Sequence, residues 1–156
     1  MSLLSSLLTV SHVALDVEAG DKKTVFERAA RLLESDSGLT RQQIIDSLNT
    51  RERMGSTGLG QGIAIPHGRV KGLREALGAF LRLRSPVAFD APDERPVNLV
   101  FILLVPERAT DVHLEILSEL AQMFSDRSFR AELAAAPDNL AAQRLIVNWQ
   151  AHAPNS

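Results

Sequence analysis

The chain has 156 residues, of which 45% are hydrophobic and 23% charged, a length and composition that suit one globular domain and not two. It contains no cysteine, which excludes disulfide scaffolds, thiolate zinc sites, iron–sulfur clusters and cysteine nucleophiles. With 17 basic against 19 acidic side chains, the formal charge of −2 offers no general attraction for nucleic acid or anionic lipid. We therefore expect no nucleic-acid partner.

The amino-terminal segment and the longest apolar run bear on membrane targeting. Residues 1–10 contain four leucines, but no basic residue precedes them and serines interrupt them, so the segment does not match a signal peptide. The longest clean apolar run, 99–105, is far shorter than the roughly 20 residues that a membrane-spanning helix needs. We predict a soluble, cytoplasmic protein without direct membrane insertion.

The hydrophobic pattern predicts strands and helices along the whole chain. Strands are expected at 12–17, 63–65, 77–83 and 97–105, and helices at 24–34, 40–54, from 110 or 111 onward, 128–136 and 139–149. Thr40 with Gln43 forms a capping-box pattern for the second helix, and Gly38 can end the first. Three prolines between 85 and 96 exclude a helix in that connection.

This order of elements predicts an α/β fold. We expect a single-domain layered sandwich with a mixed central sheet of about five strands, flanked by helices on both faces. The domain is expected to cover residues 1–150, followed by a flexible tail at 151–156.

Glycine is concentrated between residues 55 and 72, which hold six of the nine glycines. Such enrichment indicates tight turns or close approach of the backbone to a ligand. The apolar stretch 63–65 is expected to present His67 at its end, with Pro66 restricting the backbone and Gly68 letting another molecule approach the imidazole. The alternative is a surface histidine hydrogen-bonded within a turn.

Two further residues are candidates for contact with an anion. His113 is expected in the first turn of its helix, where unpaired backbone N–H groups and the helix dipole favour anions and keep the imidazole neutral. Arg51 is expected on the inward side of the second helix, near its end, and a guanidinium can hold two phosphate oxygens at once. The alternatives are a surface or core histidine and a surface salt bridge. The other histidines, His12 and His152, lie in an ordinary strand pattern and in the tail.

Metal and nucleotide chemistry find no support in the pattern. A catalytic zinc site needs three protein ligands, and no Asp or Glu stands at a recognisable ligand spacing to the candidate histidines. No Walker loop or Gly-x-Ser-x-Gly elbow is present, and the glycine-rich run 58–62 is not followed by a helical pattern. We therefore predict no metal and no cofactor.

Three separated segments resemble a known family. They are Arg51-Glu-Arg-Met-Gly-Ser-Thr-Gly-Leu-Gly-Gln-Gly-Ile-Ala-Ile-Pro-His67-Gly, Phe89-Asp-Ala-Pro-Asp-Glu-Arg-Pro-Val-Asn-Leu-Val-Phe101 and Leu104-Val-Pro-Glu-Arg-Ala-Thr-Asp-Val-His113-Leu. In this order they resemble the enzyme IIA proteins of the bacterial phosphoenolpyruvate-dependent phosphotransferase system, of the fructose/mannitol/nitrogen-regulatory type. The resemblance covers nearly the whole chain.

The resemblance implies a phosphocarrier with assigned residues. It implies that His67 accepts a phosphoryl group from an HPr-type phosphohistidine protein, that His113 assists and that Arg51 stabilises the phosphorylated state. Ser56 and Thr57 are further candidates for contact with the phosphoryl group. The wording Met-Gly-Ser-Thr-Gly is similar to the nitrogen-regulatory branch. Regulatory targets such as sensor kinases or potassium-transport components are the partners that this branch implies.

Two alternatives stay open at this point. One is a stand-alone sugar-specific IIA component that passes its phosphoryl group to a separate IIB protein. The chain has neither the cysteine of a IIB domain nor the spanning segments of a membrane IIC domain, so it cannot transport sugar alone. The other is an adaptor domain that senses an anion without covalent modification.

Overall fold

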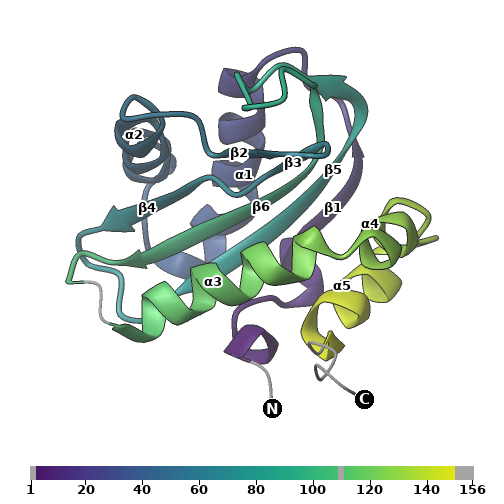
Figure 1. Ribbon diagram of the computed structural model, residues 1–156. Helices are drawn as coiled ribbons and strands as arrows, with labels where there is room; N and C mark the ends of the chain where they lie inside the picture. Colours follow the sequence, from purple (N-terminus) through teal and green to yellow (C-terminus); the bar gives the residue numbers. More distant parts are fainter. Residues whose placement is uncertain (1–2, 109–110, 150–156) are drawn as a thin grey trace.

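The computed structural model describes residues 3–108 and 111–149, which form a mixed sheet with helices on both faces (Figure 1). In chain order the strands are β1 (Val13–Val17), β2 (Gly58–Gly60), β3 (Ile63–Ala64), β4 (His67–Val70), β5 (Leu77–Val87) and β6 (Val97–Pro106). The helices are α1 (Lys22–Ser37), α2 (Arg41–Glu52), α3 (Asp111–Ser125), α4 (Arg127–Ala134) and α5 (Asn139–Asn148), with short 3-10 turns η1 (Leu3–Ser6) and η2 (Val10–His12). The predicted α/β sandwich is confirmed, with six strands in its sheet.

Strand β6 is the centre of the sheet. The strands follow the order β1-β5-β6-β3-β2, and β4 also pairs with β6. Strand β5 is antiparallel to β6, whereas β3 and β4 run parallel to it. Nearly every residue of β6 is buried, as expected for a continuous apolar strand covered on both faces.

Two hydrophobic cores lie on the two faces of this sheet. Helices α1 and α2 cover one face, with Phe26 and Phe89 among the buried residues of that core (Figure 1). Helices α3, α4 and α5 cover the other, with Phe101 and Phe124 in the second core. Because both cores share β6, the helices on either face are held against one rigid strand.

The helix ends follow the predicted signals closely. Gly38 ends α1 in the left-handed conformation, at φ 73°. Thr40 caps α2 and forms the reciprocal capping box with Gln43, as predicted, although α2 ends at Glu52, two residues before the expected end. Helix α3 begins at Asp111, and the alternative cap Thr110 lies outside the described residues, as does the predicted tail.

The glycine-rich span contains two strands that the hydrophobic pattern did not predict. Strands β2 and β4 are short and rich in glycine or polar residues, so they have no apolar alternation to signal them. His67 consequently opens β4, whereas the sequence predicted it at the end of a strand. Pro66 separates β3 from β4 because it has no N–H for the sheet, while its carbonyl accepts a hydrogen bond from Leu103 N at 2.9 Å.

The amino-terminal leucines belong to the core. Leu4, Leu7 and Leu8 are buried beside α5 and β5. The carbonyl of Leu7 accepts a hydrogen bond from Gly78 N, and that of Leu8 from the side-chain amide of Gln143, both at 3.0 Å. No helix within the described residues is both long and apolar enough to cross a membrane.

Candidate functional site

The imidazole of His67 is held in one tautomer by two hydrogen bonds. Its Nδ1 lies 2.9 Å from the carbonyl oxygen of Ile65, and because a carbonyl can only accept, Nδ1 carries the proton. Its Nε2 is then unprotonated, and the lone pair on this nitrogen accepts a hydrogen bond from Nε of Arg51 at 3.2 Å. The nitrogen with nucleophilic character is therefore Nε2, on the side of the ring that faces Arg51.

Arg51 reaches His67 from the last turn of α2. Its Nη1 donates to the carbonyl oxygen of Gly55 at 2.8 Å, which fixes the guanidinium between the helix end and the imidazole. The prediction that Arg51 points inward is confirmed, and its side chain is half-buried. A single arginine thus ties α2, the following turn and β4 together.

Gly68 allows α2 to lie close enough for this contact. A Cβ at position 68 would lie 2.9 Å from the carbonyl oxygen of Ser47 in α2, closer than real Cβ atoms come. The hydroxyl of Ser47 donates to the carbonyl of Arg69 at 2.8 Å and fastens the helix to β4. The sequence predicted that Gly68 leaves room for another molecule, but the space beside it is filled by α2.

Burial keeps His67 neutral. Loss of solvent lowers the pKa of His67 from its ordinary value of 6.5, and the positive charge of Arg51 lowers it further. The hydrogen bond to Ile65 and the negative charge of Glu52 oppose these effects without reversing them. At neutral pH the ring is therefore uncharged and retains the Nε2 lone pair.

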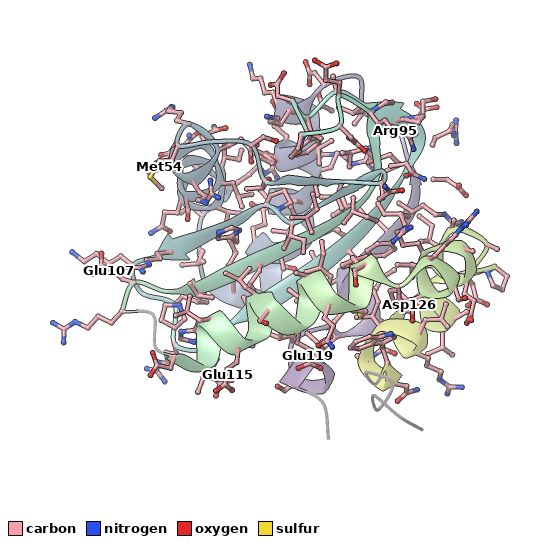
Figure 2. The ribbon with its side chains drawn as sticks, in the orientation of Figure 1. Met54, Arg95, Glu107, Glu115, Glu119 and Asp126 are labelled. Atoms are coloured by element: carbon pink, nitrogen blue, oxygen red, sulfur yellow. The ribbon has the colours of Figure 1, made fainter. Side chains whose placement is uncertain are left out.

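His67, Arg51 and His113 line one cavity of about 680 Å³. The cavity lies between α2, β4, the end of β6 and the first turns of α3, and apolar side chains such as Leu103 form part of its wall. Met54, shortly after α2, and Glu107, directly after β6, both line it and lie on the same side of the molecule (Figure 2). Three predicted site residues, far apart in sequence, thus face one space.

The charges at the cavity extend beyond the predicted residues. Arg69 and Lys71, both exposed, line it from β4 and the turn after β4. Asp46 and Glu107 are the carboxylates in its lining. With Arg51 included, the cations outnumber the carboxylates, which favours a bound anion.

Glu52 is a supporting residue that the sequence analysis did not single out. Its carboxylate accepts hydrogen bonds from Thr57 N at 3.0 Å and Thr57 Oγ1 at 2.6 Å, and it pairs with Lys22 Nζ at 3.0 Å. Only 7% of the Glu52 side chain is exposed. Its position beside Arg51, in the segment that carries the family resemblance, was the signal available in the sequence.

The structure gives Ser56 and Thr57 partners away from the cavity. The hydroxyl of Ser56 donates to the carbonyl of Phe89 and accepts from Gly58 N, and the hydroxyl of Thr57 donates to Glu52. Neither residue lines the cavity of His67. Their contact with a phosphoryl group stays a prediction.

The remaining histidines and acidic residues form no metal site within the described residues. No group of three or more His, Asp or Glu side chains among residues 3–108 and 111–149 is arranged to hold a metal ion. His12 is buried where η2 meets β1, at 3% exposure, and His152 lies outside the described residues.

Comparisons with known proteins show which family the chain is similar to. The family model described as phosphoenolpyruvate-dependent sugar phosphotransferase system, EIIA 2, matches residues 6–149. A nitrogen regulatory protein from Pseudomonas aeruginosa is 42% identical over 151 residues, covering 96% of this chain and 98% of the relative. A fructose-specific EIIA component from Haloferax volcanii is 34% identical over 106 residues, covering 68% of this chain and 69% of that protein.

A solved structure matches the whole architecture. The crystal structure of the nitrogen regulatory protein IIA-Ntr from Neisseria meningitidis superposes with a TM-score of 0.89 at 51% identity, covering 93% of this chain and 99% of that one. The chain therefore belongs to the EIIA type-2 family of the phosphotransferase system. Members of this class carry phosphoryl groups, and the relatives that match over almost the full length are nitrogen regulatory proteins.

Proposed function

We propose that this protein accepts a phosphoryl group on Nε2 of His67 from an HPr-type phosphohistidine protein, within the nitrogen-related branch. The single observation that supports it most directly is the hydrogen-bonded pair of His67 and Arg51, in which Nδ1 is bound to the carbonyl of Ile65, Nε2 faces Arg51, and both residues line the cavity. A neutral imidazole with its lone pair directed toward a cationic group is arranged for attack on phosphorus.

The transfer needs no metal ion or nucleotide. The Nε2 lone pair forms the new bond to phosphorus while the bond between phosphorus and the donor imidazole breaks, and the donor nitrogen takes back its electron pair. Nδ1 keeps its proton, so positive charge develops on the ring while Ile65 accepts the hydrogen bond. The protein therefore contributes positioning and charge stabilisation to the reaction, and no proton is transferred at His67.

Arg51 has hydrogen-bonding capacity left for the transferred group. Its Nε and Nη1 have partners, but Nη2 has none within the part of the chain that the structure describes. Once Nε2 is bonded to phosphorus, Nε–H and Nη2–H can donate to two phosphoryl oxygens. His113, across the cavity in the first turn of α3, assists at the same group from the other side.

Phosphorylation would change the charge of the surface that partners contact. A phosphoryl group brings about −1.5 to −2 charges. Arg69 and Lys71 stand beside the cavity, and Met54 and Leu114 are exposed apolar residues in its lining. Partners that bind the unmodified apolar and cationic surface would be released, and sensor kinases or potassium-transport components are the regulatory targets that we propose.

A phosphorylation assay tests the assignment. We expect incubation with phosphoenolpyruvate and the upstream relay proteins to add one acid-labile, base-stable phosphoryl group per chain, which His67→Ala abolishes and His113→Ala only slows. Intact-mass measurement records the addition. A wild-type protein that stays unmodified would support the anion-sensing adaptor, and a modified His67→Ala protein would place the phosphoryl group on another residue.

The fructose-specific relative gives a second candidate its support. A stand-alone sugar-specific IIA component would pass the phosphoryl group onward to a cysteine of a separate IIB protein. Incubating the phosphorylated protein with IIB proteins separates the two roles, because a sugar relay discharges rapidly to its IIB partner. We expect slow discharge, since the relatives matched over the full length are nitrogen regulatory proteins.

A further inference from the structure

A second hollow lies on the other side of α2, away from His67. This α1–α2 groove, defined by Lys23, Glu27 and Arg31 of α1 and by Arg41, Ile45 and Arg53 with neighbouring polar residues of α2, has a volume of about 590 Å³. None of these residues lines the cavity of His67. Helix α2 therefore separates two sites, and the groove has no part in the proposed phosphoryl transfer.

The residues along the groove form two regular rows. Lys23, Glu27 and Arg31 follow each other at four-residue intervals, so they lie on one side of α1. Arg41, Ile45 and Asn49 of α2 and Arg53, which directly follows α2, are also spaced by four residues and line the same groove. Each row has a cation at both of its ends.

The two helices run in opposite directions. The ion pair of Lys22 with Glu52 joins the start of α1 to the end of α2, and that of Glu34 with Arg41 joins the end of α1 to the start of α2. Lys23 and Arg53 therefore lie toward one end of the groove and Arg31 and Arg41 toward the other. Lys23 and Arg31 are eight positions apart and so lie about 12 Å apart along α1, and Arg41 and Arg53, twelve positions apart, lie about 18 Å apart, at 1.5 Å per residue.

Three of the four cations that line the groove make no close ion pair in the described part of the chain. Arg41 pairs with Glu34 at 2.6 Å, but Lys23, Arg31 and Arg53 make no ion pair within residues 3–108 and 111–149. Glu27 is the acidic residue in the lining, between the two cationic ends. The groove is thus cationic although the whole chain has a charge of −2. An anion that reaches both ends would relieve the repulsion between these cations.

We propose that the α1–α2 groove binds an extended acidic segment of a partner protein. In an extended chain each residue spans about 3.3 Å, so acidic residues about four positions apart reach both cationic ends. Glu27 repels a carboxylate in the middle, where Ile45 offers an apolar contact. A short inorganic triphosphate concentrates its charge at one point and does not match two cationic ends that lie about 12 Å or more apart.

A peptide with two pairs of glutamates separated by Ala-Leu-Ala tests this proposal. We expect it to shift the backbone amide signals of residues 23–31 and 41–53, and to bind more weakly as ionic strength rises. A control peptide of the same composition, with its glutamates contiguous, should bind several-fold more weakly. The variant His67→Ala should bind the spaced peptide like the wild type, because His67 lies outside the groove.

A double substitution with a matched control tests whether the cations of the α1–α2 groove bind the peptide. Arg31→Gln with Arg53→Gln removes one cation from each end, and we expect binding of the spaced peptide to weaken about fivefold to tenfold. The control, Arg127→Gln with Arg144→Gln, removes the same charge from exposed positions on α4 and α5 and should leave binding unchanged. Equal weakening by both pairs, equal binding of both peptides, or stronger binding of inorganic triphosphate would overturn the proposal.

Discussion

Arg51 and Glu52 are neighbours in the last turn of α2, yet their side chains enter two different surroundings. The Arg51 cluster, which we define as Arg51, His67 and His113, faces a cavity of about 680 Å³. The Glu52 cluster, which we define as Glu52, Lys22 and Thr57, is closed, with 7% of the glutamate side chain and 23% of the lysine side chain exposed. Consecutive residues thus serve an open site and a buried contact.

The difference between the clusters lies in their unused hydrogen-bonding capacity. Glu52 accepts from three donors and only 7% of its side chain is exposed, so an incoming group has little access to it. Arg51 retains Nη2, which has no partner in the described part of the chain, and the lone pair on Nε2 of His67 accepts from Arg51. A buried charge held by several donors fixes the backbone, whereas a partly satisfied charge beside a cavity can bind a reacting group.

The largest expected effect is on the open cluster. Replacing Arg51 by lysine removes the planar guanidinium, and one ammonium group cannot contact both Nε2 of His67 and the carbonyl of Gly55 as Arg51 does. We expect phosphorylation of Arg51→Lys by the upstream phosphohistidine protein to be about 100-fold slower, measured as initial rate. Arg53→Lys, two residues on and exposed, is the matched control and should keep the wild-type rate. Equal rates for Arg51→Lys and the wild type would leave Arg51 a structural role only.

A substitution in the Glu52 cluster should affect the free energy of unfolding more than the rate of phosphorylation. In Glu52→Gln the amide replaces one acceptor oxygen by a donor, which leaves a buried N–H or hydroxyl of Thr57 without its partner. We expect the free energy of unfolding in urea to fall by about 1–3 kcal/mol. Phosphorylation should slow less than in Arg51→Lys. Glu34→Gln, which removes an exposed partner of Arg41, should change stability much less. An unchanged stability of Glu52→Gln would mean that the cluster does not hold the helix end.

The sequence predicted the open cluster better than the framework around it. A histidine between proline and glycine, a histidine in a first helical turn and an inward arginine line one cavity, although His67 opens β4 and does not end a strand as predicted. The chemistry of anion binding requires these residue types, so the residues themselves and their immediate neighbours give a local signal in the sequence. Within the framework, the regular elements could also be predicted from the sequence, because β6 is a continuous apolar run and α2 begins with a capping box.

The glycine-rich span was harder to interpret because glycine has several uses. Gly68 leaves space for Ser47, not for a ligand, and a Cβ at Gly58 would lie 2.8 Å from that of Ala91. The contacts that require these glycines join residues more than twenty positions apart, so no local pattern reveals them. The partners of Glu52 were hidden for the same reason, since Lys22 lies thirty residues away.

The smallest expected effect is the pH dependence that burial of His67 imposes. Its pKa in the folded protein lies below the ordinary value of 6.5, because burial and the charge of Arg51 both disfavour the protonated ring. As pH falls below about 6.5, the unfolded chain takes up a proton that the folded protein does not, so stability decreases with falling pH until the lowered pKa is reached. Above that window both states are neutral and the contribution vanishes.

Two measurements check this dependence. An imidazole titration followed by nuclear magnetic resonance should place the midpoint of His67 below 6.5, with Nδ1 protonated in the neutral form, and Arg51→Gln should raise that midpoint because the charge that lowers it is gone. As pH falls from neutral through this window, His67→Gln should lose less stability than the wild type, a comparison that cancels the other histidines. A midpoint at or above 6.5 would show that burial and the charge of Arg51 do not lower the pKa of His67.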